Sequence, residues 1–442
     1  MRPKNLHQVL RDELHHLRQQ VQNLPAETLA RRSGFLRRRP RKVPMTSFLL
    51  ALLAVATESV LSLERIASLI ALATQLPYSK QALHKRLTPA IEKFLAQVAA
   101  ALFGQLPEAA SLLLGYFKPF GRVLLHDSTV ETLPDHLAKI FPGTRNQRKG
   151  FAALKIQFIA DLLSSQLVHL SLSGFTRNDQ AAAGDILQVA RPGDLILRDL
   201  GYFVLRALRW IGELEAFYVS RCRADVTLYD PRTGQLLDLA AELRRHGRLD
   251  RRVLLGAERL PTRLIALPAP EEVANERRRK AKNNRDKRSH PSARRLFLLG
   301  WNLLITNVPK TVWPAQVAAA IYRLRWRVEM IFKAWKSHLG LRRFQCQSAN
   351  VLRLSVMTKL LFCALVYRCC QSLELLCGQA DRHVSLQRLA RIMADCACLV
   401  EAHLLNVTPE QLCEHNLANH AFYEPRKDRK NFPELVAQIT AG

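Results

Sequence analysis

Apolar residues recur at helical spacing over much of the first quarter of the chain. The pattern spans residues 5–24 and resumes from 47 to about 103, where residues 63–76 form one predicted helix. Pro77 ends that helix, and Ser79 can cap the next one. The polar side chains of that next helix are Lys80, Gln81, His84, Lys85 and Arg86. Two helices with a short break are compatible with a helix-turn-helix that contacts DNA, and a plain helical pair with a solvated face is the alternative.

The middle of the chain changes to short apolar runs that are typical of β-strands. These runs span residues 122–126, 154–162, 167–172, 195–198 and 216–220. The second and third form a predicted hairpin, and predicted helices near 186–190 and 204–211 flank the fourth. A sheet with interspersed helices indicates an α/β core.

The periodicity stays strand-like from residue 225 to 299, with a predicted strand at 296–299. A basic run at 277–295 interrupts it, with ten Lys and Arg against a single acid. Such a run is usually a solvated, mobile loop, and a loop that clamps phosphates is the alternative in this protein. Helical patterns return at 315–341 and from 351 to about 397.

The charge of the chain is unusual, although its composition is otherwise ordinary. Of 442 residues, 48% are hydrophobic, and 66 Lys and Arg against 37 Asp and Glu give a net charge of +29. This charge predicts a polyanionic partner, because each cation near a phosphate displaces a condensed counterion. Nucleic acid is the first candidate. An anionic membrane surface is the weaker one, since no basic amphipathic helix with an aromatic face stands out.

No segment predicts a membrane span or a secretion signal. The longest apolar run, residues 48–56, is about half of the ~20 residues that a spanning helix needs. The N-terminus has no apolar signal-peptide core, so we expect a cytoplasmic protein. The nine cysteines form no C-x-x-C pair. They are interpreted as small buried hydrophobes in a reducing compartment, and zinc is not expected.

One face of the predicted helix at 315–341 is rich in polar side chains. At about 100° per residue, five of them fall within an arc of roughly 80°. They are Tyr322, Arg325, Glu329, Lys333 and Lys336. A separate apolar face would pack against the protein, which leaves an aromatic hydroxyl, a carboxylate and three cations in line. A solvated stripe with ion pairs between residues four apart is the alternative.

Two acids directly follow predicted strands of the core. Asp127 follows the first strand, and Asp199 follows the strand at 195–198. Acids at the carboxyl ends of strands lie where α/β sheets build their sites, although a lone Asp there is usually a turn or cap residue. Asp161 and Asp194 are competing acids in the same core.

The spacing Tyr322-x-x-Arg325-x-x-x-Glu329-x-x-x-x-x-x-Lys336 resembles a known signature. It matches the Y-R-E-K motif of the DDE transposases of bacterial insertion sequences, specifically insertion-sequence family four. Asp199-Leu-Gly201-Tyr202 resembles the second motif of that family, and His126-Asp127-Ser-Thr129 resembles its first. Trp301 and the segment Thr306-Asn307-Val308-Pro309 resemble the approach to the signature helix. The resemblance spans about residues 120–345.

The resemblance implies an α/β fold with a ribonuclease-H-like mixed-sheet core, interrupted by a β-strand-rich insertion and flanked by helical N- and C-terminal regions. Asp199 and Glu329 are 130 residues apart, which is far more than one strand and one helix require. The expected domains are a helical DNA-binding region at 1–118, the first part of the core at 119–224, the insertion at 225–300, the second part of the core with the Glu helix at 301–345, and a helical region at 346–442.

Three carboxylates can perform phosphodiester chemistry without a Ser, Cys or His nucleophile. Two divalent ions about 3.5–4 Å apart activate the attacking oxygen and stabilise the leaving one. Mg²⁺ prefers carboxylate oxygens and keeps waters and substrate phosphate in its shell. Asp127, Asp199 and Glu329 are therefore the expected catalytic residues and ligands of two Mg²⁺, with Mn²⁺ as a substitute. Water and then a DNA 3′-hydroxyl would be the successive nucleophiles.

The remaining signature residues are expected to bind DNA. Arg325, Lys333 and Lys336 would hold phosphates near the cut end, and Tyr322 would donate a hydrogen bond to one. In relatives that cut through a hairpin, an aromatic in the Trp301 segment stacks on a flipped base, which is worth about 1–3 kcal/mol. A Trp packed in a strand is the alternative.

These observations predict a bacterial, nucleoid-associated DNA transposase. It would bind terminal inverted repeats of double-stranded DNA, excise the element by cut-and-paste and join its ends to target DNA. The resemblance further implies a homodimer in a synaptic complex, with the C-terminal helices as the contact. Two rival functions use the same features: a ribonuclease-H-like nuclease without strand transfer, and a catalytically inactive DNA-binding relative.

Overall fold

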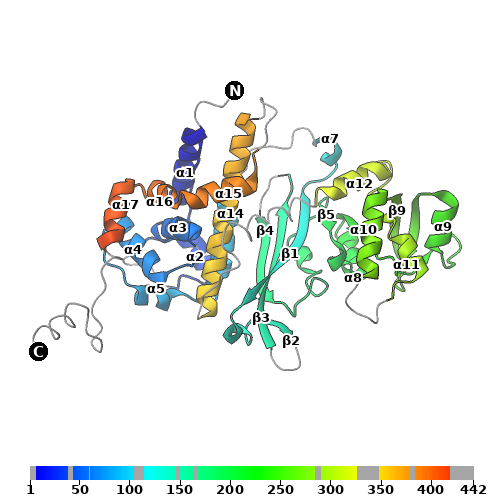
Figure 1. Cartoon of the computed structure of the whole chain (residues 1–442), viewed down its shortest axis with the longest axis horizontal. Coiled ribbons are helices and arrows are strands. Elements are labelled where there is room, and N and C mark those ends of the chain that lie inside the picture. The colour runs from blue at the N-terminus through cyan, green and yellow to red at the C-terminus, as the bar shows by residue number, and fades with distance from the viewer. Residues whose placement is uncertain are drawn as a thin grey trace, which may run out of the picture.

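The computed structural model describes residues 6–37, 43–58, 60–103, 114–145, 150–163, 167–283, 290–325, 348–377 and 384–418. The molecule is elongated, with a helical body at one end and the central sheet beside it (Figure 1). The segment that contains α9, α10 and α11 forms the opposite end. The core sheet therefore lies between a helical body and a second body that contains both helices and strands.

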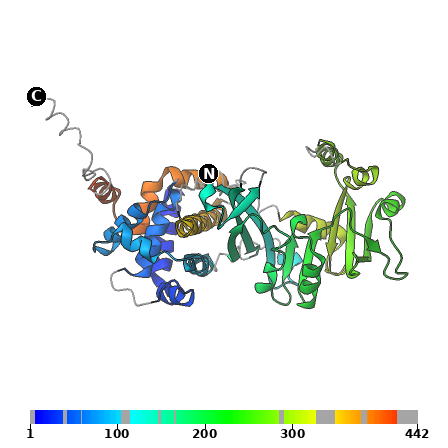
Figure 2. The same cartoon turned by 90° about the horizontal axis from the view of Figure 1, so that it is seen from below.

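Both ends of the chain contribute to the helical body. Its N-terminal members are α1 (Leu6–Asn23), α2 (Ala26–Arg32), α3 (Met45–Ala54), η1 (Val55–Thr57), α4 (Leu63–Thr74), α5 (Lys80–Arg86) and α6 (Ala90–Phe103). Its C-terminal members are α14 (Ala349–Cys377), α15 (Leu386–Asp395), α16 (Ala397–Leu405) and α17 (Pro409–Asn416). Buried side chains of α1, α3, α14 and α16 belong to one apolar cluster, and the orange C-terminal helices lie among the blue N-terminal ones in Figure 2.

Helix α3 lies in the interior of this body. Eight of its residues are buried, as expected for a helix that is apolar on every side. Ser79 caps α5 by accepting a hydrogen bond from the Ala82 amide at 3.2 Å, which confirms the predicted helix start. Among the described residues, no helix combines the length and the apolar character needed to cross a membrane.

The core sheet has the arrangement of a ribonuclease-H-like fold, as predicted. Its strands are β1 (Val123–Leu133), β2 (Pro142–Arg145), β3 (Gly150–Asp161), β4 (Leu167–Gly174), β5 (Leu195–Arg198) and β6 (Phe217–Arg221). Apart from β2, which pairs with β3, these strands lie in the order β4-β3-β1-β5-β6. β3 runs antiparallel to both neighbours, whereas β1, β5 and β6 are mutually parallel. α7 (Leu114–Phe117) precedes β1, and α8 (Leu205–Glu213) connects β5 to β6.

Short 3-10 turns complete the core: η2 (Asp135–Leu137), η3 (Asp185–Gln188) and η4 (Leu200–Tyr202). The helix predicted near 186–190 is only the 3-10 turn η3. Its run of apolar residues is too short to sustain α-helical hydrogen bonding beyond one turn.

The insertion continues the core sheet. It contains β7 (Leu228–Tyr229), α9 (Leu239–His246), β8 (Leu249–Leu255), β9 (Leu260–Pro268), α10 (Glu271–Lys282) and α11 (Ala293–Leu298), followed by β10 (Trp301–Thr306). β10 pairs with β6 on one side and with β9 on the other, so that one ten-stranded sheet crosses from core to insertion.

Two predictions for this region are wrong. The described part of the basic run at 277–295 lies largely in helices α10 and α11, whereas a loop was expected; residues 284–289 lie outside the described residues. The apolar run at 296–299, predicted as a strand, belongs mostly to α11. Ser292 caps this helix by accepting from the Arg295 amide at 3.2 Å, and such short apolar runs fit either element by periodicity alone.

The cysteines are not uniformly buried. Cys222 and Cys363 lie in the interior, as predicted, but Cys398 and Cys413 on α16 and α17 are exposed. Helix α17 lies at the outer edge of the helical body (Figure 1), whereas α16 is partly buried and carries Cys398 on a side that faces solvent.

Candidate active site

Asp127 lies inside a strand, whereas the sequence predicted it just after one. β1 continues to Leu133 because its pairing with β3 extends without a break from Leu124 to Leu133. The Ser128 amide donates to Oδ1 of Asp127 at 2.8 Å. The guanidinium of Arg325 donates to its Oδ2 at 3.0 Å. The carboxylate is therefore held by its own strand and by a residue 198 positions away.

Asp199 follows β5 directly, as predicted, and it precedes η4. Parallel pairing of His126 with Arg198 places the next residue of each strand at the same edge of the sheet. Oδ1 of Asp199 accepts a hydrogen bond from the Tyr322 hydroxyl at 3.4 Å and lies 3.9 Å from a guanidinium nitrogen of Arg325. The side chain of Asp199 is 37% exposed, against 16% for Asp127, so one side of the pair faces solvent.

Arg325 brings the two predicted acids together. Its guanidinium, 11% exposed, reaches both carboxylates at 3.0 and 3.9 Å. One positive group thus contacts two acids that are 72 residues apart in the sequence. Hard divalent cations take carboxylate oxygens as ligands, so the side chains of Asp127 and Asp199 have the right chemistry to bind a metal.

Tyr322 lies at the end of α12 (Ala315–Arg323), beside this pair. Burial raises the pKa of its phenol, with the Asp199 carboxylate adding to the shift against the opposing effect of Arg325. The hydroxyl therefore stays protonated and remains a hydrogen-bond donor at neutral pH. The predicted helix at 315–341 is helical only to Arg323 among the described residues, with Leu324 and Arg325 in a turn.

Three predicted site residues, Glu329, Lys333 and Lys336, lie outside the described residues. The two competing acids have structural contacts instead. Oδ1 of buried Asp161 accepts from the amides of Val123 and Leu163, and Asp194 forms a two-point ion pair with Arg122 at 2.6 and 3.1 Å.

Sequence reasoning overlooked Asp179, which lies in the loop between β4 and η3. Its Oδ1 lies 2.7 Å from the hydroxyl oxygen of Ser128, the residue that follows Asp127. The same oxygen lies 2.7 Å from the ammonium nitrogen of Lys155 on the neighbouring strand β3. A possible signal in the sequence was Gly201, whose missing side chain leaves room for this carboxylate.

Trp301 is the first residue of β10 and pairs with Pro268 of β9. It is half-buried, and its ring centroid is 6.0 Å from that of Phe297. It lines a cavity of about 560 Å³, together with Leu200 next to Asp199. The arginines that line this cavity are Arg221, Arg223, Arg277, Arg294 and Arg295.

A second cavity, of about 580 Å³, adjoins the carboxylate pair. Tyr322 and Arg325 line it, and it shares Arg221 and Arg277 with the first cavity. Burial, and then the positive charge of Arg221, lower the pKa of Arg277. Among the described residues, neither of these two arginines forms an ion pair with a carboxylate. The first cavity is also lined by Asp225, which is paired with Arg223, but arginines outnumber acids in the lining of both cavities and suit them to an anion.

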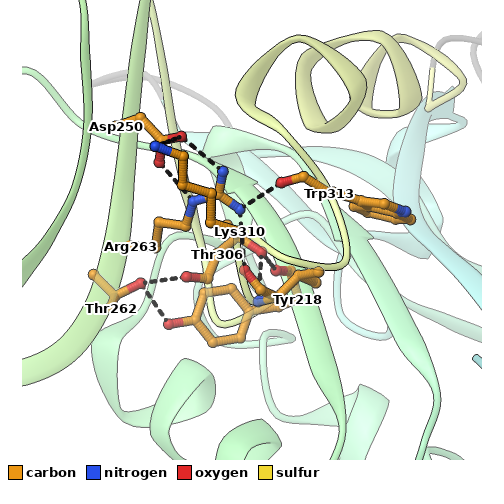
Figure 3. A network of polar contacts seen from close by, with 8 residues as sticks. Tyr218, Asp250, Thr262, Arg263, Thr306, Lys310 and Trp313 are labelled. Carbon is orange, nitrogen blue, oxygen red and sulfur yellow. Dashed lines mark hydrogen bonds and ion pairs between the residues drawn. The ribbon is translucent and has the colours of Figure 1, made fainter. Parts of the chain in front are cut away.

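The insertion holds the segment that leads into α12. Asp250 on β8 binds the guanidinium of Arg263 on β9 at 2.6 and 2.9 Å. Arg263 then donates to the carbonyls of Val308 and Trp313 at 3.2 and 2.9 Å (Figure 3). Thr262, Tyr218 and Thr306 form an adjoining set of hydrogen bonds across β9, β6 and β10.

The same segment is also bound by the core. The Asn307 side chain accepts from the Tyr218 amide at 2.7 Å and donates to the Ala216 carbonyl at 2.8 Å. The position of Tyr322 and Arg325 therefore depends on contacts from both the core and the insertion.

Comparisons with known proteins relate the chain to transposases. The family described as transposase DDE domain matches residues 118–366. The transposase of insertion sequence element IS231C from Bacillus thuringiensis subsp. berliner is 29% identical in an alignment of 358 positions that covers 76% of this chain and 74% of that protein. The transposase of element IS1151 from Clostridium perfringens is 26% identical in an alignment of 302 positions that covers 62% of this chain and 63% of that protein. A piggyBac transposase in a synaptic complex with hairpin DNA, solved by cryo-EM, is 9% identical with a TM-score of 0.40, and the match covers 92% of this chain and 84% of that one.

Proposed function

Because the chain belongs to the insertion-sequence transposases with a DDE domain, we propose that it binds the terminal inverted repeats of its element and transposes it by cut-and-paste. It would cleave DNA in a metal-dependent reaction and join the ends to target DNA, with hairpin ends as an intermediate. The observation that carries this proposal is the pair Asp127 and Asp199, which share the guanidinium of Arg325.

The metal ligands in this proposal are Asp127, Asp199 and Glu329. Divalent ions, Mg²⁺ with Mn²⁺ as a substitute, would activate the attacking oxygen and stabilise the leaving oxygen of the phosphodiester. Arg325 supports the site before DNA arrives, because its charge lowers the repulsion between the two carboxylates. With DNA bound, Arg325 would hold a phosphate beside the cut, along with Lys333 and Lys336. Tyr322, whose raised pKa keeps its hydroxyl protonated, would donate to the same region.

We propose that the two arginine-lined cavities receive the DNA end. Phosphate contacts from Arg and Lys supply most of the affinity of such complexes. Arg221 and Arg277 line both cavities, and the second cavity also contains Arg325. Trp301 in the first cavity offers an aromatic face on which an extrahelical base could stack, which is consistent with the hairpin route.

Helix α5 is proposed to contact the inverted repeat away from the cut. Lys80, Gln81, His84 and Lys85 on this helix are exposed. A homodimer that brings two ends together stays a prediction. α14 and α16 contribute many buried side chains within the monomer, so α15 and α17 are the C-terminal helices with more surface to offer a partner.

Cleavage of the element's end DNA tests the proposal. Wild type should nick and then join DNA with Mg²⁺ and do neither with a chelator. Asp127→Ala, Asp199→Ala and Glu329→Ala should each slow cleavage by about a hundredfold or more, because the metal supplies several kcal/mol of charge stabilisation. The control Glu213→Ala, an exposed acid at the end of α8, should cleave like wild type.

DNA binding should survive all three substitutions and weaken steeply with salt. Full cleavage by any one acid variant would remove that residue from the site. Cutting without joining would point to the ribonuclease-H-like nuclease, and binding without either reaction would point to the inactive relative.

A further inference from the structure

The reverse face of the sheet, behind the two carboxylates, carries a buried polar cluster. Side chains alternate between faces along a strand, so His126 and Ser128 point away from the face that Asp127 occupies. Lys155 and Gln157 on β3 share that reverse face, because Gln157 pairs with Ser128 in the β1–β3 register. Among the described residues, Asp179 is an acid that contacts this cluster, through Ser128 and Lys155.

Asp179 joins two neighbouring strands at this point. The Ser128 hydroxyl and the Lys155 ammonium both approach its Oδ1 to 2.7 Å. The Lys155 side chain is only 5% exposed, and a buried ammonium needs a nearby carboxylate. Burial alone would raise the pKa of Asp179, but the hydrogen bonds from Lys155 and Ser128 outweigh it and lower that pKa. Asp179 is therefore ionised and tightly held.

The same carboxylate also contacts the turn that carries Asp199. A Cβ on Gly201 would lie 2.9 Å from Oδ2 of Asp179, closer than real side chains approach. Gly201 is not among the glycines with positive φ, so space and not backbone conformation requires a glycine there. The next residue, Tyr202, anchors the same turn by donating from its hydroxyl to Gln157 Oε1 at 2.6 Å.

We propose that Asp179 is a positioning residue that sets the spacing between Asp127 and Asp199 from the reverse face of the sheet. It acts on Asp127 through Ser128, whose amide donates to that carboxylate, and on Asp199 through contact with Gly201. Asp179 touches neither DNA nor metal in this role. The inference rests on the proposed function, in which those two carboxylates hold the metal.

Mn²⁺ binding without DNA provides a test that does not depend on turnover. Residues that orient metal ligands typically contribute about 10–100-fold in metal affinity. Titration of the full chain, followed by electron paramagnetic resonance of free Mn²⁺, should show affinity at least about tenfold weaker in Asp179→Asn. Gly201→Ala, which leaves every charge in place, should also weaken Mn²⁺ binding by forcing the turn away from Asp179.

Asp194→Asn is the matched control for general loss of stability. It removes a buried carboxylate from an ion pair with Arg122, at the opposite end of the β1–β5 pair. It should lower the melting temperature yet leave Mn²⁺ affinity as in wild type. Equal affinities in Asp179→Asn and Asp194→Asn would overturn the positioning role, even if both unfold at lower temperature.

Asp127→Asn separates failure of this inference from failure of the proposed function. Loss of Mn²⁺ binding in Asp127→Asn together with wild-type affinity in Asp179→Asn would overturn the inference alone. Unchanged Mn²⁺ binding in Asp127→Asn would overturn the metal site itself, and the role of Asp179 with it.

Discussion

The guanidinium of Arg325 contacts the carboxylates of both Asp127 and Asp199. This one residue therefore shows that two acids far apart in the sequence are neighbours in the fold. Arg325 and Tyr322 were found from the sequence by their spacing, since a helical repeat of three to four residues puts side chains on one face. Asp179 had no such pattern, because its partners are on other strands.

The role of Trp301 can be tested at the same scale. Trp301→Ala should slow hairpin formation on the order of tenfold, because one stacked base is worth about 1–3 kcal/mol. First-strand nicking should change less. Denaturing gels of end-labelled DNA separate the two products. The control Trp210→Ala alters a half-buried tryptophan on α8 and should affect neither step. Equal slowing of both steps by Trp301→Ala would assign the ring to packing.

At the scale of elements, helix α5 carries exposed basic side chains, and contacts at both of its ends fix its position. Ser79 caps its start, and the guanidinium of Arg86 lies 5.6 Å from the Tyr78 ring centroid. The Leu87 carbonyl just after the helix accepts from Asn350 at 3.0 Å, near the start of α14. The sequence predicted the helix and its cap, because both depend on neighbours in the chain. The contact with Asn350 joins residues 263 positions apart and leaves no local pattern.

Removing charge from α5 should weaken binding to the element's ends. A plot of log affinity against log salt concentration has a negative slope. In the double variant Lys80→Ala/Lys85→Ala the size of this slope should decrease by about two, because each lost phosphate contact lowers it by about one. Fluorescence anisotropy with labelled end DNA at several salt concentrations measures this slope. Lys93→Ala, an exposed cation on α6, is the control and should leave it unchanged. An unaltered slope in the double variant would exclude α5 from the DNA interface.

At the scale of the whole molecule, the helical body joins helices from the N-terminal and C-terminal parts of the chain. Arg65 on α4 pairs with Glu58 at 3.3 Å and with Glu401 on α16 at 2.5 Å. Lys359 on α14 donates to the Glu58 carbonyl at 2.8 Å. Burial raises the pKa of Glu401 to about 7, with Glu58 adding to the shift and Arg65 opposing it. The junction between the N- and C-terminal helices therefore contains an acid that titrates near neutrality.

This raised pKa predicts that the contribution of Glu401 to folding stability falls as the pH rises from about 4.5 to 7. In that window the folded state binds more protons than the unfolded one, so that raising the pH favours unfolding. The effect of Glu401 is on the order of 3 kcal/mol at most. Glu401→Gln should therefore shrink the difference between melting temperatures measured at pH 5 and pH 8. Glu64→Gln, an exposed acid on α4, should leave that difference as in wild type, and an undiminished difference in Glu401→Gln would contradict the assignment.

Local patterns determined much of this protein. Apolar runs indicated the core strands, helical spacing indicated α1 and α4, and the spacing of Tyr322 and Arg325 indicated the site. Each of these depends on residues close in the chain, whose side chains share a face or a cap. Where the pattern was short or purely polar, as at 277–299, it did not distinguish helix from strand or loop.

Only the tertiary structure decided how these parts meet. The pairing of β10 with β6 and β9 makes the insertion a continuation of the core sheet, and the packing of α14 and α16 joins the two ends of the chain. The contacts of Asp179 with Ser128 and Gly201, beside the two carboxylates, arise in the same way. Such contacts form because segments far apart in the sequence have complementary shapes and bury surface against each other. The sequence of one segment alone does not identify the segment that it will contact.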